Sequence, residues 1–275
     1  MTDAEFHYAL SRLRSGTAAG DDGVYTEMVT HLGPVGLQWL RKLLSRSLSS
    51  GIVPGAWRRL NIVPIPKPGK DTTKAASYRP IALTSVIAKL AERVVATRLS
   101  HLLEPTLSPS QSGFRPELTT LDPVSLLVDR VLEGFNHYMD HADQRQNRLP
   151  DSTTLVKRFE RTLSVPVDFT AAFDRVDRNL LLRKLLGKGV PPRLVRWIAN
   201  FLQDRRAYVS AEDRHSRKFT PAAGVPQGTV LGPILPTAWP GTTTQYPAPP
   251  GSHTEAPHPC PPMRPCLPGL PSDGC

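Results

Sequence analysis

Cysteine is absent from the first 259 residues of this 275-residue chain, whose three cysteines are Cys260, Cys266 and Cys275. This absence excludes a disulfide framework or a cysteine-ligated zinc site from most of the chain. No apolar run approaches the roughly 18 residues that a membrane span requires. The N-terminal residues MTDAEFHYAL also lack the basic region and long apolar core of a secretory signal. We therefore expect an intracellular protein without a membrane span.

The last forty residues, 236–275, contain no lysine, and their only charged residues are Glu255, Arg264 and Asp273. The same stretch holds 12 prolines, which remove backbone donors and fix φ, so that neither a helix nor a sheet can propagate. We expect a proline-rich tail that is disordered or extended as polyproline II. The preceding 235 residues have the periodicity of a folded domain.

Basic residues outnumber acidic residues by 34 to 24, which gives the chain a formal charge of +10. Such an excess produces a positive surface that attracts polyanions, nucleic acid first among them. A basic protein without a polyanionic partner is the alternative that charge alone leaves open.

Apolar repeats at three-to-four spacing predict three helices. The first covers residues 85–103, with Thr84 or Ser85 as its N-cap. The second follows Asp177 and ends at Gly187 or Gly189. The third begins near Pro192 and carries one apolar face, formed by Leu194, Val195, Ile198 and Leu202.

Residues 165–169 alternate with period two and predict a strand, and a strand-like apolar run predicts another at 62–65. Residues 207–211 and 218–222 flank a polar turn and predict a hairpin. The turn of this hairpin is expected at residues 212–215. Helices interleaved with a few strands indicate an α+β fold, in which helices pack on one face of a small antiparallel sheet.

Three segments could carry chemistry. Asp168 ends a predicted strand, and a carboxylate there suits a Mg²⁺ site, although helix capping is its commoner role. Residues 222–235 form a glycine- and proline-rich loop in which Gln227 offers a donor and an acceptor and Gly228 permits close backbone approach. In residues 61–79, Lys67, Lys70 and Arg79 crowd around a loop as a possible triphosphate clamp, or else form a solvated basic loop.

Taken together, these segments resemble the reverse transcriptase of non-LTR retrotransposons. The resemblance rests on blocks in the family's order and spacing, and it covers roughly residues 5–235. The blocks are Ala-Gly-Asp-Asp-Gly at 19–23, Lys-Pro-Gly-Lys at 67–70, Tyr-Arg-Pro at 78–80, Gln-Ser-Gly-Phe-Arg at 111–115, Asp168 with Ala-Phe-Asp at 172–174, and Gly-Val-Pro-Gln-Gly at 224–228. Each block is weak alone, but a chance match of all of them in order is improbable.

The resemblance implies a right-hand polymerase with fingers in residues 1–160, a partial palm in 161–235 and the tail in 236–275. Asp168 and the backbone carbonyl of Phe169 would bind Mg²⁺, and Phe173 would exclude the ribose 2′-OH. The triphosphate would be held by Lys67, Lys70 and Arg79, and the nucleotide and template pocket would be shaped by Gln227 and Gly228. The implied reaction is two-metal nucleotidyl transfer from a deoxynucleoside triphosphate to a DNA primer on an RNA template, with a nuclear location.

Two departures from the family pattern point to an inactive chain. The family's hairpin with two adjacent aspartates should follow residue 228, but no Asp-Asp pair occurs after Asp168. Pro166 lies inside the strand that should present Asp168, where it removes a ladder donor. The composition of the tail leads to the hypothesis of a truncated or frameshifted copy whose frame breaks after Leu235.

Two alternatives remain open. One is a non-catalytic, nucleic-acid-binding remnant that keeps the basic surface of the fingers. The other is a reverse transcriptase of the group II intron type. The Lys-Pro-Gly-Lys and Gly-Phe-Arg-Pro motifs favour the non-LTR type over this alternative.

Overall fold

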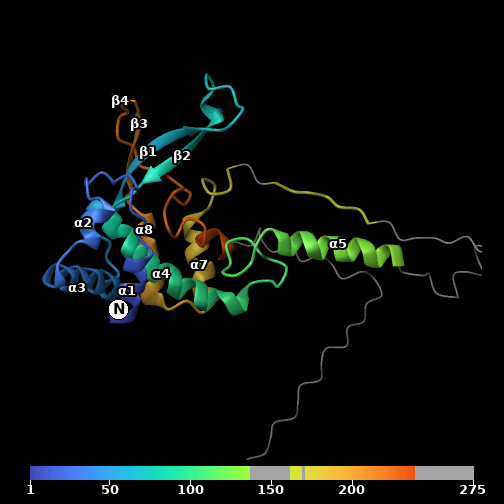
Figure 1. The fold of residues 1–275 in the computed structure, drawn as a ribbon, viewed down its shortest axis with the longest axis horizontal. Helices are drawn as coiled ribbons and strands as arrows, with labels where there is room; N and C mark the ends of the chain where they lie inside the picture. Colours follow the sequence, from blue (N-terminus) through green and yellow to red (C-terminus); the bar gives the residue numbers. More distant parts are fainter. Residues whose placement is uncertain (137–161, 169–170, 213, 239–275) are drawn as a thin grey trace, which may run out of the picture. The chain divides into compact units, whose positions relative to one another are not determined.

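A computed structural model describes residues 1–136, 162–168, 171–212 and 214–238 of the chain. All of these residues belong to one unit, Met1–Thr244 (Figure 1). Apart from residues 236–238, the predicted tail lies outside the described residues. In the described part of the chain, no helix is both long enough and apolar enough to cross a membrane.

The described residues form more helix than strand. The α-helices are α1 (Asp3–Ser11), α2 (Thr26–Thr30), α3 (Pro34–Ser50), α4 (Val86–Leu103), α5 (Leu121–Asn136), α7 (Arg178–Gly187) and α8 (Pro192–Leu202). Short 3-10 helices are η1 (Gly55–Arg58), η2 (Ala75–Ser77), η3 (Glu104–Thr106) and η4 (Leu235–Ala238).

The three predicted helices are confirmed as α4, α7 and α8. The Ser85 hydroxyl accepts a hydrogen bond from the Ala88 amide at the start of α4. Asp177 caps α7 by accepting from the Leu180 amide at 3.0 Å. The four apolar residues predicted for one face of α8 are all buried. These helices form as predicted because their caps and periodicity are local properties of the sequence.

Helix α4 lies among the other helices and supplies much of the main core (Figure 1). Helices α1, α2 and α3 contact it, and α8 packs in turn on α3 and α7. Leu90, Val95 and Leu99 of α4 are fully buried. The main apolar core is therefore built largely by helices packing on one another.

The sheet has four strands, in the order β2-β1-β3-β4: β1 (Arg59–Pro66), β2 (Tyr78–Leu83), β3 (Arg206–Ala211) and β4 (Arg214–His215). The strand predicted at 62–65 is confirmed as part of β1. β1 pairs antiparallel with β2, and Pro64 faces Pro80. β3 pairs with β1 only over Arg59–Ile62, so Pro64 and Pro66 interrupt no hydrogen bond to β3.

Three predictions about the sheet need correction. The sheet is mixed, because β1 and β3 are parallel and are joined by a long crossover that contains helices. It also contributes a separate small cluster, Leu60, Ala82 and Ala207, and does not serve as the main platform for the helices. The hairpin partner of β3 is Arg214–His215, while the predicted strand 218–222 makes only an isolated bridge from Phe219 to Ala207.

The strand predicted at 165–169 is wrong in its described part, because residues 162–168 form no strand. Val165 and Val167 are 72% and 74% exposed. Alternating residues become a strand only where a neighbouring strand supplies hydrogen bonds, and no described strand pairs with this segment. Pro166 also removes one of the donors that such pairing would need.

Candidate active site

The loop at residues 224–228 joins two parts of the chain that are distant in sequence. On one side, the Gly224 amide donates to the Val176 carbonyl at 2.9 Å, and the Val225 amide donates to the Phe173 carbonyl at 2.8 Å. Gly224 has φ +81°, and a Cβ there would lie 2.7 Å from the backbone of Asp174. Glycine is therefore required here both for its backbone conformation and for the close approach.

The other side of this 224–228 loop rests on β2. The Ala82 amide, on the edge of β2 away from β1, donates to the Gln227 carbonyl at 2.9 Å. Gly228 has φ +95°, and a Cβ there would lie 2.9 Å from the Ala82 oxygen and 3.2 Å from Ile81 Cγ2. The loop thus connects the Phe173 segment to β2 through backbone contacts that leave no room for a side chain at Gly228.

Arg178 is a loop-holding residue that the sequence reasoning missed. Its Nε donates to the Gly224 carbonyl and its Nη2 to the Ala223 carbonyl, both at 2.9 Å. The half-buried guanidinium therefore fixes the loop entrance to the start of α7. Its position directly after the N-cap Asp177 was the available signal, but nothing local identifies which carbonyls it meets.

Phe173 is half-buried and packs against the main core. Its ring meets the ring of Phe114 edge-on, with centroids 6.4 Å apart and planes at 78°. Phe114 is 59% exposed, so this aromatic pair lies at the surface of the site. The family-like block at 111–115 and the block around Phe173 are therefore neighbours.

Arg115 stabilises the segment that carries Phe114. Its Nη1 donates to the carbonyls of Ser108 and Gln111, at 3.1 and 2.8 Å, and its guanidinium pairs with Glu104. A planar guanidinium with several donors is suited to holding a loop in this way.

The Ala-Gly-Asp-Asp-Gly block at 19–23 lies against the junction of β2 and α4. A Cβ on Gly20 would lie 2.6 Å from the Ser85 nitrogen, so glycine is required at this contact. Asp21 accepts from the Tyr208 hydroxyl at 2.8 Å and pairs with Arg59 at 3.2 Å. The block thereby ties β1 and β3 together next to the strand that supports the 224–228 loop.

The predicted triphosphate clamp is spread along the β1–β2 hairpin. Arg79 is exposed on β2, and alternation places it on the same face as Ile81, beside Gly228. The Lys67 amide bonds to the Ser77 carbonyl, and its Nζ donates to the Ala76 carbonyl at 2.8 Å. Because Ser77 comes five residues before Ala82, Lys67 lies about 17 Å along the strand from the Gln227 contact. The structure thus brings Arg79 near the loop but leaves Lys67 and the exposed Lys70 at the far end of the hairpin.

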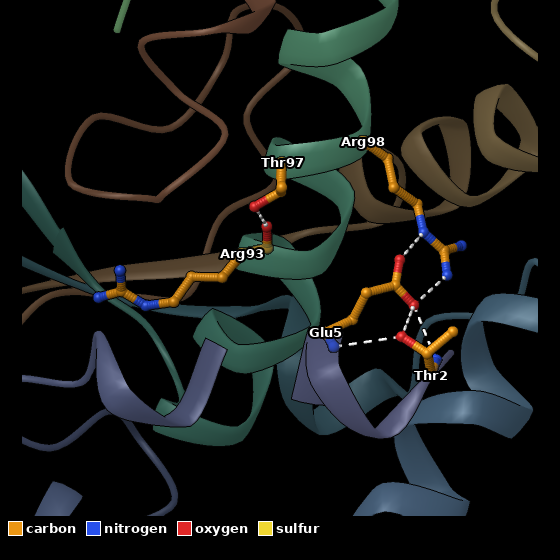
Figure 2. Close-up of polar contacts among 5 residues, drawn as sticks. All are labelled: Thr2, Glu5, Arg93, Thr97 and Arg98. Carbon is orange, nitrogen blue, oxygen red and sulfur yellow. Dashed lines mark hydrogen bonds and ion pairs between the residues drawn. The ribbon is translucent and has the colours of Figure 1, made fainter. Parts of the chain in front are cut away.

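The polar side of α4 carries Lys89, Arg93 and Arg98, and one of these basic side chains is held in an ion pair. Arg98 binds Glu5 through two hydrogen bonds, at 2.7 and 2.9 Å, while Thr2 caps α1 beside them (Figure 2). The hydrogen bond from Arg98 holds the pKa of Glu5 at about 2, below its ordinary 4.5. Arg93 extends away from this ion pair (Figure 2), and Lys89 is half-buried, which lowers its pKa.

Asp168 is exposed, and Phe169, its predicted companion in the metal site, lies outside the described residues. No group of three His, Cys, Asp or Glu side chains in the described residues could hold a metal ion. Asp168 offers one carboxylate, whereas two-ion chemistry requires several oxygen ligands around ions about 4 Å apart. The described residues therefore do not form a two-metal site.

Comparison with known proteins identifies the family of this chain. The protein-family model described as "Reverse transcriptase (RNA-dependent DNA polymerase)" matches residues 65–238, more than half of the chain. The chain belongs to this family. The matched region contains β2, Phe173 and the 224–228 loop, which the backbone contacts bring together.

The relatives place the chain among the reverse transcriptases of non-LTR elements. The chain is 30% identical over 251 residues to the "Probable RNA-directed DNA polymerase from transposon BS" of Drosophila melanogaster, covering 90% of this chain and 25% of the relative. It is 30% identical over 237 residues to the polymerase from mobile element jockey of the same species, covering 86% and 24%. It is 26% identical over 225 residues to the Pol polyprotein of the element R2DM, covering 82% and 19%.

These relatives favour the non-LTR type over the group II intron alternative. The chain spans about a quarter of the length of the first two relatives. Members of the family generally use Mg²⁺, RNA templates, DNA primers and nucleotide substrates.

Proposed function

We propose that residues 1–238 are the nucleotide- and template-binding part of an RNA-directed DNA polymerase from a non-LTR retrotransposon. The observation that carries this proposal is the double attachment of the 224–228 loop, to the Phe173 carbonyl on one side and to the Ala82 amide on the other. This attachment brings the block at 172–174, the block at 224–228 and strand β2 next to one another. The fingers and palm assignments, 1–160 and 161–235, belong to this proposal, as does a nuclear location.

The proposed site residues would contact different parts of the nucleotide and template. The exposed Arg79 would contact the triphosphate near the loop, and Lys67 and Lys70 would contact phosphates further along the hairpin. Phe173 would lie against the sugar and select deoxynucleotides, because its ring, braced by Phe114, fills the space of a 2′-OH. Gln227 and Gly228 would shape the pocket for the base and the template. Asp168 would contribute one carboxylate to catalysis.

We propose further that the chain alone does not polymerise DNA, because its sequence has no Asp-Asp pair after Asp168. Binding does not depend on that pair, so the chain should behave as a nucleic-acid-binding protein. A non-catalytic remnant is thus the second candidate, and it predicts binding to the primer–template without a response to the matched nucleotide and without recovery of synthesis on repair.

The test measures how tightly the full chain binds an RNA template annealed to a DNA primer. Fluorescence anisotropy reports this affinity with and without a deoxynucleoside triphosphate. We expect binding that weakens with salt and that strengthens when the nucleotide matches the template base. Absence of binding to the primer–template at low salt would refute the proposal. Binding without any response to the matched nucleotide would favour the remnant.

A further inference from the structure

Glu92 is a fully buried carboxylate in the middle of α4. Charged side chains are almost never fully buried without a partner. Its Oε2 accepts hydrogen bonds from the Val230 amide at 2.8 Å and the Leu231 amide at 3.2 Å. Glu92 therefore connects the central helix to the residues that directly follow the 224–228 loop.

The two amides belong to a tight turn at residues 229–232. The Thr229 hydroxyl donates to the Pro226 carbonyl at 2.9 Å and accepts from the Gly232 amide at 3.0 Å. The Leu231 carbonyl accepts from the Leu235 amide as the chain enters η4. Amides at the start of such a turn have no carbonyl behind them, and a carboxylate is a strong acceptor for them. Glu92 accepts from the two amides as the side chain of an N-cap residue accepts from the first amides of a helix.

The buried surroundings of Glu92 make a charged side chain at this position unfavourable for the stability of the fold. Burial raises the pKa of Glu92, and the charge that most opposes this rise is Arg205, with Lys89 contributing less. Glu92 Oε1 has no hydrogen-bond partner among the described residues, and neither do Nε and Nη2 of Arg205. Apolar packing often serves stability at least as well as a buried pair of charges. A role beyond stability would account for a charge at this position.

The loop is attached at its entrance, its tip and its exit, and Glu92 supplies the attachment at the exit. Its entrance is fixed by the bonds of Gly224 and Val225 to the Phe173 segment, and its tip by the bond from Ala82 to Gln227. Its exit is fixed by the turn that Glu92 holds.

We infer that Glu92 is a positioning residue for the nucleotide site, acting through the turn at 229–232 on Gln227 and Gly228. The nucleotide part of this inference rests on the proposed function, whereas the positioning of the loop does not. Two measurements separate these parts.

The first measurement is amide hydrogen exchange of the full chain and of the variants Glu92→Ala and Glu92→Gln. In Glu92→Ala, the amides of Val230, Leu231 and Ala82 should exchange about tenfold faster than in the wild type, beyond any change in the α8 amides. Glu92→Gln should give a smaller effect, because its amide oxygen can still accept, and it carries the test if Glu92→Ala does not fold. The matched control is Glu5→Gln, which removes a carboxylate bonded to the same helix but not to the turn.

An equal rise at all amides, including those of α8, would mean that Glu92 only stabilises the fold and would overturn the inference. Unchanged exchange at Val230 and Leu231 would also overturn the inference.

The second measurement is the affinity for thymidine triphosphate on a primer–template with adenine as the next template base. Affinity should fall about tenfold in Glu92→Ala and stay unchanged in Glu5→Gln. Faster exchange with unchanged affinity would overturn the role in nucleotide binding. If the wild-type chain binds no nucleotide while exchange changes as expected, the proposed function fails and the positioning of the loop stands.

Discussion

The carbonyl of Phe173 accepts a hydrogen bond from the amide of Val225 at 2.8 Å. This bond joins the residue proposed to contact the sugar to the loop proposed to contact the base. It is a backbone bond, so it survives substitution of either side chain. Variants at Phe173 therefore test the ring itself without removing the attachment of the loop.

Gly228→Ala should destabilise the chain by about 2 kcal/mol or more, because φ is +95° and the new Cβ would lie 2.9 Å from the Ala82 oxygen. The control is Gly69→Ala, which has φ +69° but nothing within 4 Å, and which should cost about 1 kcal/mol. Urea unfolding of both variants measures the difference. Equal losses would show that the close approach to β2 contributes nothing.

The Glu5–Arg98 ion pair should make stability depend on pH. The pKa of Glu5 is about 2 in the folded chain against an ordinary 4.5. A lowered carboxyl pKa contributes stability above the unfolded value, and this contribution is lost as pH falls from about 4.5 through 2.

Glu5→Gln should therefore cost about 1 to 2 kcal/mol at pH 7, reduced from the full linkage value by solvent screening of this partly exposed pair. The cost should shrink steadily below pH 4.5. Urea unfolding at pH 7, 5 and 3 measures it. A cost that is the same at pH 7 and at pH 3 would contradict the ion pair.

Nucleic-acid binding should weaken with salt through phosphate contacts of the hairpin. Replacing Lys70 or Arg79 with Gln should each lower the slope of log K against log salt by about 1. Arg98→Gln should leave the slope unchanged, since its guanidinium is held by Glu5 at 2.7 and 2.9 Å. Filter binding between about 50 and 200 mM salt measures the slopes. An Arg98 effect equal to that of Arg79 would mean that the helix face, not the hairpin, tracks the phosphates.

Local signals predicted the helices well. The hydroxyl of Ser85 and the carboxylate of Asp177 cap amides only three residues away. The neighbouring sequence is therefore enough to predict these contacts. The order of the family-like blocks likewise predicted the family, which the match over residues 65–238 confirms. Gly228 was predicted to permit close backbone approach, and the structure gives both Gly224 and Gly228 a steric reason to be glycine.

Long-range contacts could not be predicted in this way. The parallel pairing of β1 with β3 and the approach of Gly224 to Asp174 depend on how distant segments meet. The strand at 165–169 was predicted from alternation alone, which cannot supply a pairing partner. A buried carboxylate such as Glu92 looks, in the sequence, like any charged residue on a helix.

The central claim is that Asp168, Phe173 and the 224–228 loop belong to one polymerase site. Its most direct test is primer extension on an RNA template by a chain in which the family's two-aspartate hairpin and thumb follow Leu235 in frame. We predict Mg²⁺-dependent DNA synthesis by this repaired chain. Pro166→Val is made in parallel to remove the effect of the missing ladder donor.

In the repaired chain, Asp168→Asn should reduce synthesis about a thousandfold or more, because a neutral amide replaces the carboxylate. Phe173→Ala should keep synthesis and admit ribonucleotides. The decisive reading is the extension rate of the repaired chain against its Asp168→Asn variant. A large loss is the predicted result, and equal rates, or no synthesis even with Pro166→Val, would contradict the assignment of the site.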